Sequence, residues 1–200
     1  MTLKLALTGS IGMGKSTVAA MFVAAGIPLF DADAEVRRLQ GPGGALVSKI
    51  AERWPDSIVN GAIDRDRLGA RVLADRDELA ALEVMVHPAV QAARERFLAD
   101  HRQAPALLFD IPLLFETGGQ TAFDKIIVVS APAAIQRERV LARPGMTPAK
   151  LDSILTRQLP DADKRERADF VIDTGVTLAE TQAAVGEVLT TLGLSFAPGG

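Results

Sequence analysis

A glycine-rich stretch near the amino end, LTGSIGMGKSTVA at 7–19, contains the first residues whose types and spacing could do chemistry. It matches the pattern G-x-x-x-x-G-K-[ST]. Glycines let backbone N–H groups converge on phosphate oxygens, and a following helix adds the positive end of its dipole. We predict a nucleotide-phosphate site in which Lys15 reaches the β and γ phosphates and Ser16 holds Mg²⁺. The predicted ATP-binding residues of this loop are Gly12, Met13, Gly14, Lys15, Ser16 and Thr17. The alternative is a flexible glycine turn with a surface lysine.

Two aspartates follow the next apolar run, in FDADAEVRR at 30–38. In an extended segment Asp31 and Asp33 would point to the same side, toward the crevice that strand ends line in parallel sheets. We predict that Asp33 is the general base for an acceptor hydroxyl that attacks a γ-phosphoryl group. Arg37, one helical turn on, could pair with Asp33 or hold a substrate phosphate. Alternatively, Asp31 caps a helix and Arg37 is a solvated charge.

A third carboxylate ends the apolar run ALLFD within ALLFDIPLLFE at 106–116. Asp110 is placed like the second acidic residue of phosphate-loop proteins, which supports Mg²⁺. The turn that follows contains three apolar residues, Leu113, Leu114 and Phe115. These residues either contact an apolar part of the substrate or form a buried turn in the core. Glu116 could be a cap or a contact.

An amide and two guanidiniums recur at helical spacing further along the chain, at Gln136, Arg139 and Arg143. One helix face that carries them is suited to closing over transferring phosphates, so we assign ATP binding to both arginines and a catalytic role to Arg139. A solvated charged face is the alternative. His87, before Pro88 at a predicted helix boundary, is a lone histidine, and we assign it to substrate binding rather than to chemistry.

Short apolar runs alternate with helical patterns, which is typical of a parallel sheet covered on both faces. The predicted strands are Leu3–Thr8, Pro28–Asp31, Ala106–Asp110, Lys125–Val129 and Phe170–Asp173. We divide the chain into a core at about 1–33, 105–135 and 168–195, a helical substrate lobe at about 34–104 and a lid at about 136–167. Ser130 and Thr147 are predicted helix N-caps, the latter with Pro148 at the first helical position.

The remaining segments carry weaker predictions. A helix is expected over Lys15–Ala25, ended by Gly26. The charge run DADKRERAD at 161–169 is expected to be a surface turn, and the tail FAPGG is expected to fray.

Composition excludes several classes of protein. Hydrophobic residues make up 48% of the 200 residues, enough for a core, and the net charge of −3 favours neither nucleic acid nor an anionic membrane as a partner. With no cysteine and two histidines, disulfides, thiolate chemistry and histidine-rich metal sites are excluded or implausible. We expect no membrane span and no signal peptide, which is compatible with a cytoplasmic location.

Taken together, these segments resemble the dephospho-coenzyme A kinases. The resemblance rests on the glycine loop, DADAEVRR, HP at 87–88, DIPLLFE at 110–116, Gln136-x-x-Arg139-x-x-x-Arg143, Gln158 and ADFVID at 168–173, in the family's order. It differs from the family at Ser10, at Met13 and at Thr174, where an asparagine is common, so a side-chain contact from Thr174 to adenine is in doubt.

The resemblance implies an α/β fold of the P-loop NTPase, nucleoside-monophosphate-kinase-like class: a parallel five-stranded sheet flanked by helices, with an inserted helical substrate lobe and a lid. It implies Mg²⁺-dependent transfer of the ATP γ-phosphoryl group to the ribose 3′-hydroxyl of dephospho-coenzyme A, the last step of coenzyme A synthesis. The expected partners are dephospho-coenzyme A and ATP, and the expected assembly is a monomer or weak homo-oligomer.

Two other functions remain open from the residues alone. One is a kinase for another small alcohol, such as a nucleoside or sugar acid, which would share the loop, base and lid. The other is a nucleotide-dependent switch without small-molecule transfer. The large helical lobe and the PLLF turn favour a substrate with a long arm over a small alcohol. A carboxylate together with two lid arginines argues against a nucleotide-dependent switch.

Overall fold

The computed structural model describes residues 2–194, and the predicted tail FAPGG lies outside them. The chain divides into two compact units: a core unit drawn from Met1–Phe30 and Gln103–Gly200, and a helical unit over Asp31–Arg102. No helix among residues 2–194 is long and apolar enough to cross a membrane.

A five-stranded sheet forms the centre of the core unit, with strand order β2-β5-β1-β6-β7. Its strands are β1 (Leu3–Thr8), β2 (Leu29–Asp31), β5 (Ala106–Asp110), β6 (Lys125–Ser130) and β7 (Phe170–Asp173). The pairs of β1 with β5, β1 with β6, and β6 with β7 are parallel. All five predicted strands are confirmed to within a residue. The predicted α/β class is confirmed with them.

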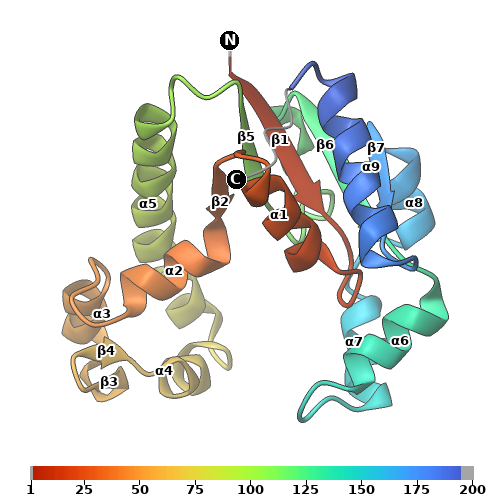
Figure 1. Cartoon of the computed structure of the whole chain (residues 1–200). Coiled ribbons are helices and arrows are strands. Elements are labelled where there is room, and N and C mark those ends of the chain that lie inside the picture. The colour runs from red at the N-terminus through yellow and green to blue at the C-terminus, as the bar shows by residue number, and fades with distance from the viewer. Residues whose placement is uncertain (1, 195–200) are drawn as a thin grey trace. The chain divides into compact units, whose positions relative to one another are not determined.

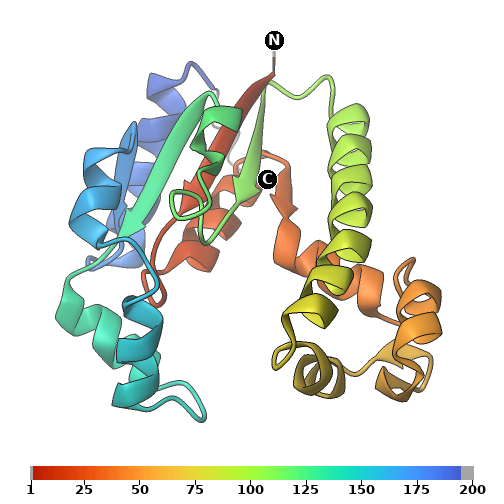
Figure 2. The same ribbon diagram turned by 180° about the vertical axis from the view of Figure 1, so that it is seen from behind.

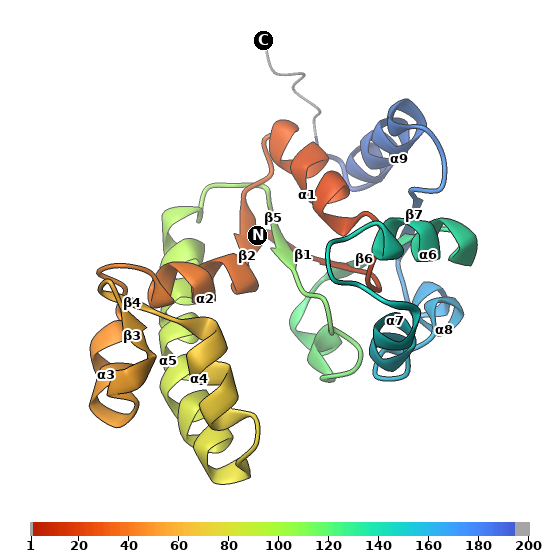
Figure 3. The ribbon, with the colours of Figure 1, turned by 90° about the horizontal axis from the view of Figure 1, so that it is seen from below.

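Helices cover both faces of this sheet. Figure 3 shows α1 (Lys15–Ala24) and α9 (Leu178–Thr191) on one face and α8 (Asp161–Glu166) on the other. Figure 2 shows α8 beside β6 from behind. Because both faces are covered, β1 and β5 consist of apolar runs, and side chains such as Leu5 and Leu108 are fully buried.

The connection from β6 to β7 contains three short helices, α6 (Ala133–Leu141), α7 (Pro148–Leu155) and α8. Thr147 caps α7 through its side chain, with Pro148 at the first helical position, as predicted. Ser130 is not an N-cap: it ends β6, and its hydroxyl donates to Asp161 Oδ2 at 2.6 Å, while Pro132 precedes α6.

The charge run at 161–169 is not a surface turn, since it forms α8 and buries Lys164 completely. A second 3₁₀ turn, η2 (Gly119–Ala122), connects the end of the Leu113–Glu116 turn to β6.

The helical unit has its own core, and Figure 1 shows its elements in orange through olive to green. The elements are α2 (Ala32–Gln40), α3 (Val47–Arg53), η1 (Pro55–Ser57), the antiparallel hairpin of β3 (Ile58–Val59) and β4 (Ala62–Ile63), α4 (Arg65–Val72) and α5 (Arg76–Asp100). Leu46 and Ile50 are fully buried there, with Trp54 beside them. The hairpin was not predicted, because each strand is only two residues long.

The predicted helix boundary at His87–Pro88 is wrong, because Pro88 lies inside the 25-residue helix α5. A proline removes one backbone hydrogen bond and crowds the preceding turn. α5 nevertheless continues, because its apolar residues on both sides of Pro88 pack on α2, α3 and α4. Packing outweighs the local preference.

Candidate active site

The loop between β1 and α1 has the backbone that phosphate binding requires. Gly12 and Gly14 have φ of +79° and +83°, and Gly14 is the residue before α1. A Cβ on Gly12 would lie 2.5 Å from Val140 Cγ2, so this position also needs glycine for close packing against α6. The loop therefore leads directly into the amino end of α1, where backbone N–H groups and the helix dipole favour an anion.

A cavity of 470 Å³ opens over this loop. It is lined by residues 9–17 together with Pro112, Arg143, Ile154 and Gln158. All of these belong to the core unit. The cavity brings together the predicted loop and the predicted Arg143. Met13 contributes only its backbone, because its side chain is 2% exposed and packs in the core.

The loop lysine faces a carboxylate from the neighbouring strand. Lys15 Nζ forms an ion pair with Asp110 Oδ1, and Asp110 lies opposite Leu7 in the register of β1 and β5. Both side chains are largely buried. Because Asp110 ends β5 at the edge of the sheet where β1 leads into the loop, its negative charge lies beside the predicted phosphate site.

The donor set here suits a magnesium ion bound with a nucleotide. Ser16 supplies a hydroxyl beside Lys15, and Asp110 supplies a carboxylate, which are the oxygen ligands that Mg²⁺ prefers. Among residues 2–194, no group of three or more His, Asp or Glu side chains could hold a metal by itself. A metal at this site would need phosphate oxygens to complete its coordination.

The three residues expected on one helix face separate in the structure. α6 ends at Leu141, so Arg143 lies in the turn beyond it and lines the cavity. Arg139 instead holds the segment after β7: its Nη1 donates to Thr174 Oγ1 at 3.0 Å and its Nη2 to the Thr174 carbonyl at 2.6 Å. The single-face prediction is wrong because the helix ends two residues before Arg143.

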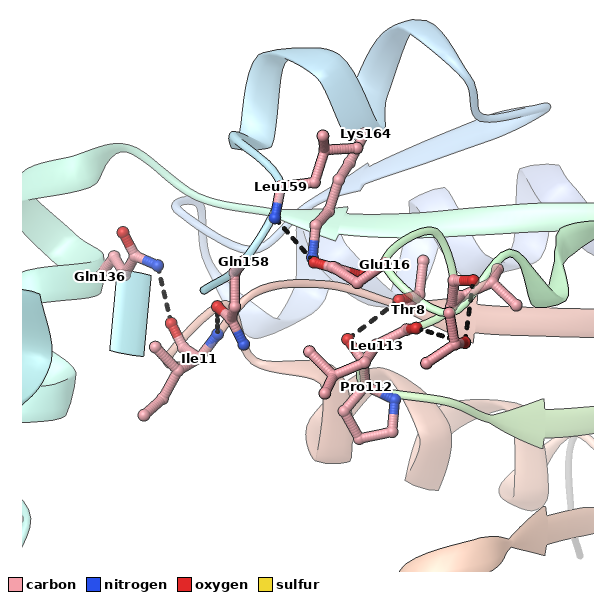
Figure 4. A network of polar contacts seen from close by, with 11 residues as sticks. Thr8, Ile11, Pro112, Leu113, Glu116, Gln136, Gln158, Leu159 and Lys164 are labelled. Carbon is pink, nitrogen blue, oxygen red and sulfur yellow. Dashed lines mark hydrogen bonds and ion pairs between the residues drawn. The ribbon is translucent and has the colours of Figure 1, made fainter. Parts of the chain in front are cut away.

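Gln136 does not face the cavity with a free amide. Its side chain is 7% exposed, and Nε2 donates to the carbonyl of Ile11 at 2.8 Å. Gln158 binds the same residue, with Oε1 accepting from the Ile11 N–H at 3.1 Å. Figure 4 shows the two glutamines reaching Ile11 from separate segments.

The turn after Asp110 divides between core and surface. Leu114 is fully buried and Phe115 is 8% exposed, whereas Leu113 is 42% exposed. Of the two readings left open by the sequence, the buried turn holds for Leu114 and Phe115. Leu113 alone offers an apolar side chain to solvent.

Glu116 is a contact rather than a cap. Its Oε1 accepts from the Leu159 N–H and lies 2.8 Å from Lys164 Nζ (Figure 4). Burial raises the pKa of Glu116, but the bonds from Lys164 and from the Leu159 N–H lower it more, so its pKa lies below the ordinary value.

The aspartate segment is extended only as far as Asp31, which ends β2, and α2 begins at the next residue. Asp31 is the N-cap of α2, and its side chain accepts from the Ala34 N–H at 2.8 Å. Asp33 therefore lies in the first helical turn, and the expectation that both carboxylates share one side of an extended segment is wrong. The alternative in which Asp31 caps a helix therefore holds. Arg37 Nη2 lies 3.8 Å from Asp31 Oδ2.

His87 also lies in the helical unit, in the middle of α5.

Two features of the core unit escaped the sequence analysis. Thr174 is buried, and its hydroxyl donates to the Met13 carbonyl at 2.7 Å while accepting from Arg139, which joins the loop to the end of β7. Lys164 is a fully buried cation. Its place in a run of charged residues gave no sign of burial, and the three charged residues that follow it are exposed. The only available signal was the helical start after Pro160.

Comparison with known proteins gives consistent results. The family model described as dephospho-CoA kinase matches residues 3–180. The dephospho-CoA kinase of Novosphingobium aromaticivorans is 55% identical over 183 residues, covering 92% of this chain and 91% of that protein. The dephospho-CoA kinase of Mesorhizobium japonicum is 50% identical over 190 residues, covering 94% and 95%.

Among solved structures, the protein TT1252 of Thermus thermophilus has a TM-score of 0.81 at 33% identity, covering 96% of this chain and 98% of that one. The dephospho-CoA kinase of Campylobacter jejuni has a TM-score of 0.67 at 21% identity, covering 96% and 97%, and shows the shared fold.

Proposed function

The chain belongs to the dephospho-CoA kinase family, and we propose that it uses ATP on the loop at 9–17 to phosphorylate the ribose 3′-hydroxyl of dephospho-coenzyme A. The observation that carries the assignment of ATP is the cavity over this loop, because glycine backbone, Lys15 and Arg143 all line it. Such a set of donors suits a triphosphate and nothing neutral.

We propose that the loop and Arg143 stabilise charge during transfer, and that Arg139, to which the sequence assigned a catalytic role, acts through the segment that it holds after β7. Backbone N–H groups and Lys15 bind the phosphates, and Arg143, which lines the same cavity, neutralises charge on the transferring group. Arg139 keeps its proposed part in ATP binding through the segment it holds after β7. Closure of the segment at 136–167 would exclude water and suppress hydrolysis of ATP.

We propose Asp33 as the general base. The reaction forms one bond, from the sugar oxygen to the γ-phosphorus, and breaks the bond from that phosphorus to the β,γ-bridging oxygen of ATP, which leaves with ADP. Asp33 accepts the hydroxyl proton as the new bond forms. Asp31 is already engaged as a helix cap and in the contact with Arg37, which favours Asp33 for this part.

Mg²⁺ is the proposed metal. When bound with ATP it would neutralise charge on the phosphate oxygens. The residues that would hold it are Ser16 and Asp110, whose oxygens suit it. With Asp110 bound to the metal, the ammonium of Lys15 would be available to bind the phosphates.

For the acceptor, we propose contacts from Arg37, His87 and the exposed Leu113, with Leu114 and Phe115 supporting the turn from the core. Arg37 would serve an acceptor phosphate, since its side chain is half exposed. A cytoplasmic location stays part of this proposal and is compatible with a sequence that has no cysteine.

The test is a mass-spectrometric assay of the purified protein with ATP, Mg²⁺ and dephospho-coenzyme A. The proposal expects ADP and a product one phosphoryl group heavier, with the phosphate on the 3′-oxygen. A parallel reaction with adenosine, shikimate and gluconate as acceptors should yield little product. Equal transfer to those alcohols, or ADP release without any phosphorylated acceptor, would overturn the assignment.

A further inference from the structure

Both backbone polar groups of one loop residue, Ile11, are held by glutamine side chains. The Ile11 N–H donates to Gln158 Oε1 at 3.1 Å, and the Ile11 carbonyl accepts from Gln136 Nε2 at 2.8 Å (Figure 4). Ile11 is the third residue of the phosphate-loop pattern that begins at Gly9. We propose that Gln136 and Gln158 are positioning residues that hold this loop in its ATP-binding conformation, an inference that rests on the proposed function.

Gln136 is held by helix α6, and Gln158 by the segment between α7 and α8. Gln136 lies in α6 with its side chain 7% exposed, so its amide has little freedom to turn elsewhere. Gln158 directly precedes Leu159, whose N–H donates to Glu116 at 2.8 Å. Glu116 in turn pairs with the fully buried Lys164.

The bonds use the two amides in opposite senses. Gln158 acts as an acceptor through its oxygen, and Gln136 acts as a donor through its nitrogen. The two consecutive peptide groups on either side of the Ile11 Cα are therefore each held by one glutamine. One bond needs an acceptor and the other needs a donor, so one glutamine cannot take the part of the other. We call the pair Gln136 and Gln158 the clasp on Ile11.

The clasp is important for binding because ordering this loop costs conformational entropy. Glycine-rich backbone loses more conformational freedom on ordering than other residues do. A loop already held in its bound shape binds more tightly, since the ligand does not have to supply that ordering. The net effect of one such hydrogen bond corresponds to about a twofold to tenfold change in affinity.

The first experiment measures ADP binding by calorimetry and thermal unfolding for Gln136→Leu, Gln158→Leu and the matched control Gln182→Leu, an exposed glutamine of α9. We expect each clasp variant to bind ADP about twofold to tenfold more weakly, with Gln182→Leu unchanged. Equal ADP affinity in all four proteins, with only the unfolding temperature lowered, would overturn the inference alone. Failure of the unsubstituted protein to bind ADP would overturn both this inference and the proposed function.

The second experiment reports on the clasp itself, through amide hydrogen exchange at Ile11 in the nucleotide-free protein. Gln158→Asn shortens the side chain and should speed exchange at Ile11 about tenfold, while the core amide of Ile127 stays protected. Gln158→Glu keeps an acceptor oxygen and should leave Ile11 protected. Exchange at Ile11 that is equally slow in Gln158→Asn would overturn the inference even if the leucine variants do not fold.

Discussion

The ammonium of Lys15 lies against the carboxylate of Asp110, where the amino-terminal loop meets the carboxyl end of β5. The pair joins two groups to which we assign different tasks, phosphate binding and magnesium binding. Phosphates that enter the cavity add negative charge beside Lys15. The proposed interaction of Lys15 with these phosphates therefore competes with its ion pair to Asp110. This relationship makes the proposed metal role of Asp110 testable by itself.

Asp110→Asn should raise the free Mg²⁺ needed for half-maximal activity about 10- to 100-fold, because the variant loses a charged oxygen at the proposed metal site. The measurement is initial rate against free Mg²⁺ at saturating ATP. Glu187→Gln, an exposed carboxylate change on α9, is the control and should leave the requirement unchanged. An unaltered Mg²⁺ requirement in Asp110→Asn would remove Asp110 from the metal site.

Removing one member of the Glu116–Lys164 pair should have unequal effects. Glu116→Gln leaves the fully buried Lys164 ammonium without its anion, and such a change typically costs about 3–5 kcal/mol of unfolding free energy. Lys164→Met replaces the cation by an apolar chain, and Glu116 keeps its bond from the Leu159 N–H. Urea unfolding of both variants checks the order. Greater loss in Lys164→Met would contradict this account of the pair.

Stability should decline at acid pH through Glu116 and Asp169. Burial raises the pKa of each, and the partners together lower it more: Lys164 and the Leu159 N–H act on Glu116, and Lys125 and the Ile126 N–H act on Asp169. Both pKa values therefore lie below the ordinary 4.5 and 3.8. A carboxyl group whose pKa is lower in the folded protein than in the unfolded chain stabilises the fold fully at pH values above its ordinary pKa. That stabilisation is lost as the pH falls from the ordinary pKa through the folded pKa.

The check is the urea midpoint measured from about pH 7 to about pH 3 for the unsubstituted protein and for Asp169→Asn. The variant should start less stable near neutral pH and lose less stability below the ordinary pKa of Asp169. Parallel curves for the two proteins would show that Asp169 carries no such linkage.

Thr174→Val should destabilise the protein by about 1–3 kcal/mol, because the buried Met13 carbonyl loses its donor while the shape of the side chain is kept. The same change removes the Oγ1 contact of Arg139. Thr174→Ser retains the hydroxyl and serves as the control in urea unfolding and in the KM for ATP. Matching stability for the valine and serine variants would show that the hydroxyl contributes nothing.

Local patterns predicted the sheet well, because buried parallel strands are written as apolar runs such as ALLFD at 106–110. The phosphate loop could also be predicted, because its chemistry depends on residues that are adjacent in the sequence. Thr147 with Pro148 was readable for the same reason. These features need no knowledge of distant segments.

Features that depend on packing between distant segments were missed. Pro88 favours a helix end locally, but contacts of α5 with other helices override that preference. Lys164 looks like a solvated charge until Glu116, far away in sequence, is brought beside it. Asp33 was assigned through an extended geometry that the capping of α2 by Asp31 replaces.

The most direct test of the central claim is single-turnover phosphoryl transfer to dephospho-coenzyme A by Asp33→Asn, with Asp31→Asn as the matched control. Asparagine caps a helix about as well as aspartate, so the control keeps α2 intact. The account predicts a rate lower by about 10²- to 10⁴-fold in Asp33→Asn. ADP affinity should be unchanged, and the rate of Asp31→Asn should be near that of the unsubstituted protein. Undiminished transfer by Asp33→Asn, or a larger loss in Asp31→Asn, would contradict the account.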